Sequence, residues 1–191
     1  MFVDLTSEAL HISADGLTDT GNNGATCLNV NAARPNLDMT TTSGVRVTGF
    51  VPKFQSGGKY TVFVTQNQSG AFQFVTASSA YTPSPGSQGI RFFNGVSGRY
   101  DIYVDDTDQP LTALTPVLRN VGPATASPYV EARGGPLFLK GASAGGKTLA
   151  LYWTPRPFVA GTNITLWVAQ ISGNTLSSVV EDCTVSSPIP A

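Results

Sequence analysis

Glycine and proline recur so often along this chain that few stretches of more than a dozen residues lack both. The 191 residues include 20 glycines and 13 prolines. Glycine weakens a helix and proline breaks one, so this spacing leaves little room for ordinary helices. Between the breaks, apolar and polar side chains alternate, as in Tyr60-Thr61-Val62-Phe63-Val64 and Ile164-Thr165-Leu166-Trp167-Val168. This period of two predicts half-buried β-strands joined by short loops.

The chain also resembles itself at two offsets. At an offset of 90 residues, Phe2-Val3-Asp4 falls on Phe92-Phe93-Asn94, and the strand after it matches in the same register. At an offset of 104, the segment 54–66 falls on 158–170 with five identities. The offsets differ by 14, so the second half carries a longer middle, between residues 106 and 153. Two matches in the same order indicate an internal duplication.

Many short strands with turn signals between them predict an all-β fold of sandwich type. Together with the duplication, they predict two tandem β-sandwich units, immunoglobulin-like or transthyretin-like, with little or no helix. We expect a first unit over residues 1–82, a linker over 83–89 and a second unit over 90–191. The linker is placed where proline, serine and glycine gather after Tyr81.

Charged residues make up only 12% of the chain, and 11 basic against 12 acidic residues give a net charge of −1. The basic residues are scattered, which argues against nucleic-acid partners and against an anionic membrane surface. No apolar run approaches the roughly 20 residues that cross a bilayer, so membrane insertion is not expected. Serine, threonine, asparagine and glutamine must supply the polar surface, a composition typical of secreted and cell-surface proteins.

The first residues, Met1-Phe2-Val3-Asp4-Leu5, lack the basic and apolar regions of a signal peptide. An extracellular or cell-surface location therefore implies that the signal has been removed. A cytoplasmic protein that starts at its natural methionine is the alternative. The two cysteines, Cys27 and Cys183, belong to no metal-binding motif. They form either one disulfide that closes a long loop or two buried free thiols.

Three segments of the second half carry a family resemblance: Ile90-Arg91-Phe92-Phe93-Asn94, Tyr100-Asp101-Ile102-Tyr103-Val104-Asp105 and Gly161-Thr162-Asn163-Ile164-Thr165. They resemble the three motif strands of a bacterial secreted tandem β-repeat family, domain of unknown function 4397. The first half matches less well, because Asp4 and His11 replace the motif Asn and Asp. The early Ser-Pro-Asp-Ala turn of the family is also absent. The resemblance implies a fold and export rather than an activity.

No constellation of catalytic residues emerges from the sequence. His11 is the sole histidine and shares a strand face with Ser13 and Asp15. Steps of about 7 Å along that face are too long for a Ser/His/Asp relay, so an exposed strand histidine is favoured. The run Gly145-Gly146-Lys147-Thr148, with Gly141 before it, ends like a phosphate-binding loop, but a strand pattern rather than a helix follows it. We expect a hairpin turn there, with no cofactor.

Asp105, Asp106 and Asp108 form the densest acidic cluster and are the candidate ligands of a calcium ion. The pattern lacks the glycine and final glutamate of an EF-hand loop. A solvated hairpin turn, in which aspartates cap backbone N–H groups, is the favoured alternative.

Apolar residues at the start of the chain and on two strands are the candidate interface: Phe2, Val3, Leu5, Phe63 and Trp167. The terminal segments 2–5 and 179–185 are apolar enough to pair with another subunit through a strand edge. Aromatic side chains on outer strand faces, with Trp153 and Tyr103 among them, could instead stack on sugar rings. Burial in the core is the third interpretation of these aromatics.

These features favour a non-catalytic extracellular structural or adhesive protein, a surface module or a subunit of a larger assembly such as a filament. Its partners would be copies of itself or other extracellular proteins. A module that binds carbohydrate or another small ligand is the alternative, and an enzyme is the less favoured one.

Overall fold

The computed structural model describes residues 1–6, 8–14, 17–19, 25–27, 37–50, 54–55, 57–67, 69–171 and 173–183. Sixteen strands make up its regular structure, with one 3₁₀ turn, η1 (Leu111–Ala113). No α-helix occurs in these ranges, and no helix there is long and apolar enough to cross a membrane. The prediction of an all-β fold is confirmed.

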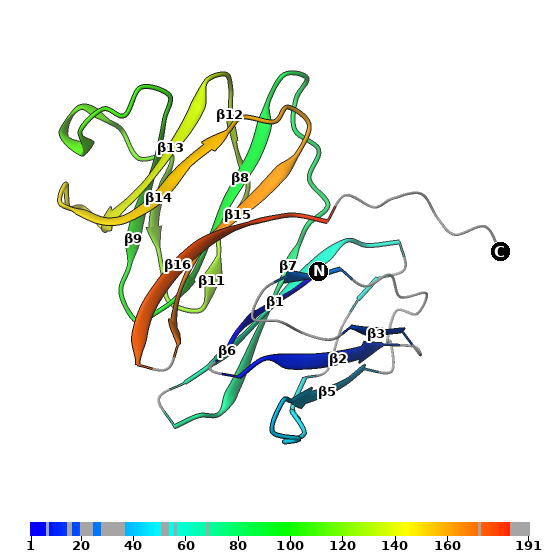
Figure 1. Ribbon diagram of the computed structural model, residues 1–191. Helices are drawn as coiled ribbons and strands as arrows, with labels where there is room; N and C mark the ends of the chain where they lie inside the picture. Colours follow the sequence, from blue (N-terminus) through cyan, green and yellow to red (C-terminus); the bar gives the residue numbers. More distant parts are fainter. Residues whose placement is uncertain are drawn as a thin grey trace.

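The strands of the first half form two sheets (Figure 1). One has the order β4-β1-β6-β7 and is built from β1 (Phe2–Leu5), β4 (Ala25–Thr26), β6 (Tyr60–Gln66) and β7 (Phe72–Ser78). The other has the order β3-β2-β5 and is built from β2 (Leu10–Ala14), β3 (Leu17–Asp19) and β5 (Leu37–Thr41). Their facing side chains form a core that includes Phe2, Leu10, Ile12, Met39, Val62 and Val64.

The second half repeats this plan with longer strands. One sheet has the order β11-β8-β15-β16, from β8 (Gln88–Gly95), β11 (Thr125–Ala126), β15 (Asn163–Ile171) and β16 (Asn174–Glu181), with β12 (Val130–Ala132) also paired to β8. The other has the order β10-β9-β13-β14, from β9 (Tyr100–Asp105), β10 (Leu118–Val121), β13 (Pro136–Ser143) and β14 (Leu149–Pro157). Ile90, Phe92, Leu139, Trp153 and Leu166 lie in the core between them.

Strand pairing in the two halves is in the same register. Phe2 pairs with Val62 where β1 runs parallel to β6, and Phe92 pairs with Leu166 where β8 runs parallel to β15. The two pairs are related by the offsets of 90 and 104 residues that the sequence shows. The predicted division into two tandem units, with its boundaries, stays a prediction.

The extra residues of the second half lie mainly in one connection. Leu10 pairs with Thr41, whereas Tyr100 pairs with Ser143, so the offset has risen from 90 to 102 by β13. The connection from β9 to β13, which holds η1 and β10 to β12, therefore carries most of the added length.

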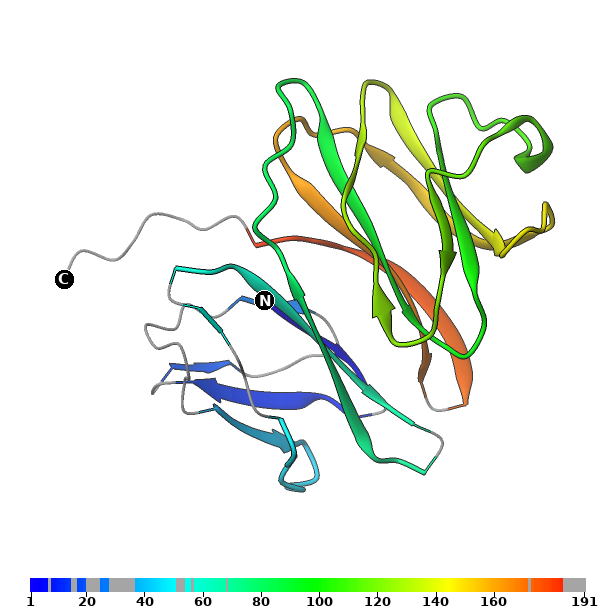
Figure 2. The same ribbon diagram turned by 180° about the vertical axis from the view of Figure 1, so that it is seen from behind.

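The sheets β4-β1-β6-β7 and β11-β8-β15-β16 lie next to one another in the middle of the molecule (Figures 1 and 2). A third core fills the space between them and includes Val3, Leu5, Phe63, Phe93 and Ala169. Strands such as β6 are therefore buried on both faces, and both Thr61 and Phe63 are inaccessible to solvent. The expectation of half-buried strands is wrong for β6, because the second half covers its outer face.

Candidate functional site

The contact between the two central sheets is the best-defined site in the described part of the chain, and we call it the junction. Phe63 of β6 and Phe93 of β8 stack there, with ring centroids 4.0 Å apart and planes 1° from parallel. Val3 and Leu5 of β1 pack around them from the first half. Trp167 of β15 packs against the same cluster from the second half. The junction is therefore an apolar contact between segments far apart in the sequence.

Arg91 of β8 lies inside the junction with no solvent exposure. Its Nε donates to Thr165 Oγ1 at 2.7 Å, within its own half. Its other acceptors belong to the first half. Arg91 Nη1 donates to the Ser78 carbonyl at 3.2 Å, and Arg91 Nη2 donates to Thr61 Oγ1 and, at 3.3 Å, to Ser79 Oγ. A buried charge is tolerated only where it is paired and hydrogen-bonded. Arg91 meets that condition with groups from both halves.

Asp182, which follows β16, supplies the opposite charge. Its Oδ2 lies 3.5 Å from Arg91 Nη2, its Oδ1 accepts from Thr165 Oγ1 at 2.8 Å, and the Tyr129 hydroxyl also donates to it. Burial is the main cause that raises the pKa of the Tyr129 phenol, and the nearby Asp182 carboxylate raises it further. Tyr129 therefore remains a neutral donor. The Arg91 guanidinium also lies over the Tyr129 ring at 4.8 Å and the Phe63 ring at 5.5 Å.

A disulfide joins Cys27 to Cys183 across 156 residues of sequence. Cys27 directly follows β4 in the first half, and Cys183 follows Asp182 at the end of the second. Of the two alternatives that the sequence allows, the disulfide is therefore confirmed. The bond links the two halves covalently beside the Arg91–Asp182 pair.

The predicted linker is held against the second half rather than projecting from it. Glu131 accepts from the Tyr81 hydroxyl at 3.0 Å and from the Ser84 backbone N–H at 2.7 Å. These hydrogen bonds, the Ser84 N–H first, lower the pKa of Glu131 to about 2. Asn163 Nδ2 donates to the Tyr81 carbonyl at 2.9 Å, and β8 already begins at Gln88. The connection between the halves is thus short and anchored.

The candidate interface residues are buried by the chain itself. Val3, Leu5 and Phe63 lie in the junction, Trp167 packs against it, and Phe2 lies in the core of the first half. Val3, Leu5, Phe63 and Trp167 are thus contact residues between the two halves, and an intermolecular role for any of the five stays a prediction. Residues 184 and 185 of the proposed C-terminal contact lie outside the described residues, as does Asp15 beside His11.

The acidic cluster forms a hydrogen-bonded turn. Asp105 Oδ1 accepts from the backbone N–H of Asp106 at 2.9 Å and of Thr107 at 3.3 Å, and its Oδ2 accepts from the Gln109 N–H. Asp108 instead pairs with Lys140 Nζ at 2.7 Å. The Asp105 and Asp108 carboxylates are therefore directed to different partners, and within the described ranges no group of three acidic, histidine or cysteine side chains converges on a metal site.

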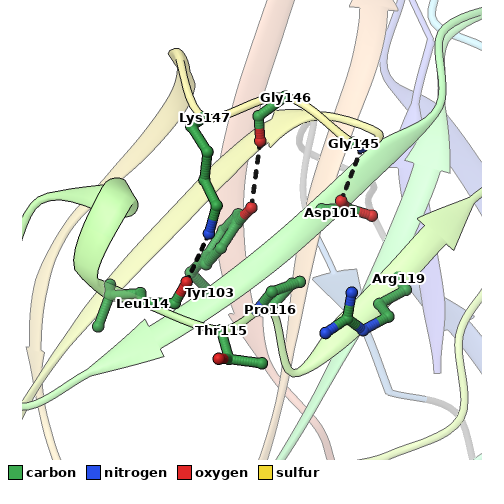
Figure 3. Close-up of a pocket in the computed structure, with 9 residues that line it drawn as sticks. All are labelled: Asp101, Tyr103, Leu114, Thr115, Pro116, Arg119, Gly145, Gly146 and Lys147. Atoms are coloured by element: carbon green, nitrogen blue, oxygen red, sulfur yellow. Dashed lines mark hydrogen bonds between the residues drawn. The ribbon is translucent and has the colours of Figure 1, made fainter.

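The glycine-rich run lies in the turn before β14 and borders a shallow pocket of about 200 Å³ (Figure 3). Lys147 Nζ donates to the carbonyls of Leu111 at 2.9 Å and Leu114 at 2.5 Å and lies 4.8 Å from the Tyr103 ring centre. Asp101 accepts from the Gly145 N–H at 2.9 Å. These side chains secure the η1 loop and the turn, as expected for a hairpin rather than a phosphate cradle.

Arg91 is the central residue of the junction, and the sequence motif Ile90-Arg91-Phe92-Phe93-Asn94 that contains it predicts no role for its side chain. An arginine flanked by apolar residues within a strand is itself a signal, because a buried guanidinium requires acceptors nearby.

No family model matches the chain, and no curated protein matches it. The C-terminal domain of AlgF from P. aeruginosa aligns at 17% identity over 52% of this chain and 99% of that domain, with a TM-score of 0.33. A candidate cell adhesion protein from Bacteroides ovatus ATCC 8483 aligns at 11% identity over 97% of this chain and 98% of that one, with a TM-score of 0.25. At these TM-scores neither likeness bears on function.

Proposed function

We propose that this chain is a non-catalytic structural or adhesive module that works outside the cell or on its surface, as a subunit of a larger assembly. The observation that carries the proposal is the junction. There the Cys27–Cys183 disulfide and the buried Arg91–Asp182 pair join the two halves of the chain. Such a double attachment suits a part that must keep its shape under load.

The extracellular location is supported by chemistry. Disulfides form and persist in oxidising compartments, and they are rare where glutathione keeps thiols reduced. The low charge content and the hydroxyl- and amide-rich surface fit the same location. Membership of the domain of unknown function 4397 family is part of the proposal and would also imply export.

Assembly would use the outer strands of the sheets. β14 and β16, with nine and eight residues, each end a sheet of the second half. An outer strand offers unpaired backbone N–H and C=O groups to another chain. Leu149 on β14 and Leu176 on β16 are about half exposed, which adds apolar contact area beside those groups.

Treatment of intact source cells with a protease that cannot enter them tests the location. The proposal predicts that the chain is degraded while a cytoplasmic marker survives, and that non-reduced peptide maps contain the Cys27–Cys183 link. Protection of the chain, together with free thiols at both cysteines, would rule out an extracellular module.

A further inference from the structure

The shared register of the two halves makes individual positions comparable across them. In the first half Val64 of β6 pairs with Phe74 of β7. Val168, which follows Val64 by the same offset of 104 residues, pairs with Ser177 of β16. Ser177 therefore stands where the first half has a phenylalanine.

The surroundings of the two positions also correspond. In the first half Phe74 stacks on Phe50 at 4.9 Å, and Phe50 meets Phe2 edge-on at 6.3 Å. In the second half Trp153 meets Phe92, the counterpart of Phe2, edge-on at 6.0 Å. Trp153 thus takes the place of Phe50. The ring that would stack on it is missing, because Ser177 carries none.

A groove of about 350 Å³ occupies this place, lined by residues 152–157 of β14 and 177–179 of β16. It is large enough for a ring, since an engineered protein cavity of about 150 Å³ holds benzene. Trp153 lines the groove and is only 3% exposed.

We propose that this groove is a docking site for an aromatic side chain of a partner protein. The partner's ring would lie where the Phe74 ring lies in the first half. Because β14 and β16 are both outer strands, an extended partner segment can reach the groove along their edges. That the occupant is a protein rests on the proposed function; that it carries a ring rests on the comparison of the halves.

Nuclear magnetic resonance of the ¹⁵N-labelled full chain tests the site through its indole N–H signals. Trp153→Phe assigns the two tryptophans, and Trp167 in the junction is the internal reference. The probes are N-acetylphenylalanine amide, N-acetylleucine amide and a methyl glucoside. We expect the phenylalanine probe to shift the Trp153 signal saturably and the Trp167 signal to stay in place. The leucine probe should bind more weakly, and the glucoside should give no shift.

Variants at one position separate a filled groove from a damaged fold. Ser177→Phe restores the ring of the first half and is expected to weaken probe binding about tenfold or more, because it fills the groove. Ser177→Ala leaves the groove open and should bind like the wild type, as should Thr148→Phe, which adds a ring at an exposed site elsewhere. Ser177→Leu is the second filling variant if Ser177→Phe does not fold.

No shift of Trp153 up to the solubility limit, or undiminished binding by a folded groove-filling variant, would overturn the proposal. A stronger response to the glucoside would replace it with a saccharide site. The probes report neither export nor assembly, so failure here leaves the proposed function standing, and failure of the proposed function leaves the ring site standing.

Discussion

Phe63 and Phe93 stack on each other across the junction, one from each half, with ring centroids 4.0 Å apart. Both are fully buried, so truncating either leaves a cavity between the sheets. We expect Phe63→Ala to lower the free energy of unfolding by about 3–5 kcal/mol. Phe63→Leu, which keeps most of the volume, should cost less. Denaturant unfolding measures both, and equal losses for the two variants would contradict the cavity account.

Arg91→Met should destabilise the chain by about 3–5 kcal/mol, because it leaves the Asp182 carboxylate buried without its cation. Asp182→Asn in the same chain removes that charge, so the double variant should recover part of the loss. Urea titrations of the single and double variants make the comparison. If the double variant were less stable than Arg91→Met alone, the Arg91–Asp182 pairing would not explain the effect.

Replacing both cysteines with serine should lower the stability by about 2–5 kcal/mol, since the disulfide closes a very long loop in the unfolded chain. Reduction of the wild type should reproduce the loss, and reductant should leave the double serine variant unchanged. Thermal unfolding with and without reductant is the measurement. An unchanged melting temperature on reduction would show that the bond contributes nothing to stability.

Asp4 gives a prediction for pH. Burial raises the pKa of its carboxyl above the ordinary value, although Thr6 and the Leu10 N–H donate to it. A carboxyl whose pKa is higher in the folded than in the unfolded chain makes its full contribution to stability below the unfolded-state pKa of about 3.9. That contribution is lost as pH rises through the folded-state pKa. The stability of the wild type minus that of Asp4→Asn should therefore fall from pH 4 to 7. A constant difference would mean that Asp4 does not titrate in this range.

The strands and their register could be predicted because they follow from local alternation and from the duplication. The offsets relating Phe2 to Phe92 and Val62 to Leu166 reappear as equivalent parallel pairs. The aspartate turn could also be predicted from the sequence, because Asp105 caps the backbone N–H groups that directly follow it.

The junction could not be predicted from these patterns. Thr61 and Thr165 have the polarity of a solvent-facing strand surface, yet both are buried and bind Arg91. Alternation gives the same signal whether water or a buried arginine satisfies the polar face. The cysteines show a similar limit, because their spacing allows a disulfide but only the fold brings Cys27 to Cys183.

Sedimentation velocity of the oxidised full chain over a range of concentrations, with negative-stain images of the same samples, tests most directly whether it is a subunit of an assembly. The account predicts larger species or filaments that grow with concentration. Leu176→Lys, which places a charge on the exposed outer strand β16, should shift them towards monomer, whereas Thr148→Lys should not. Monodisperse monomers at the highest concentration, identical for wild type and Leu176→Lys, would contradict the account.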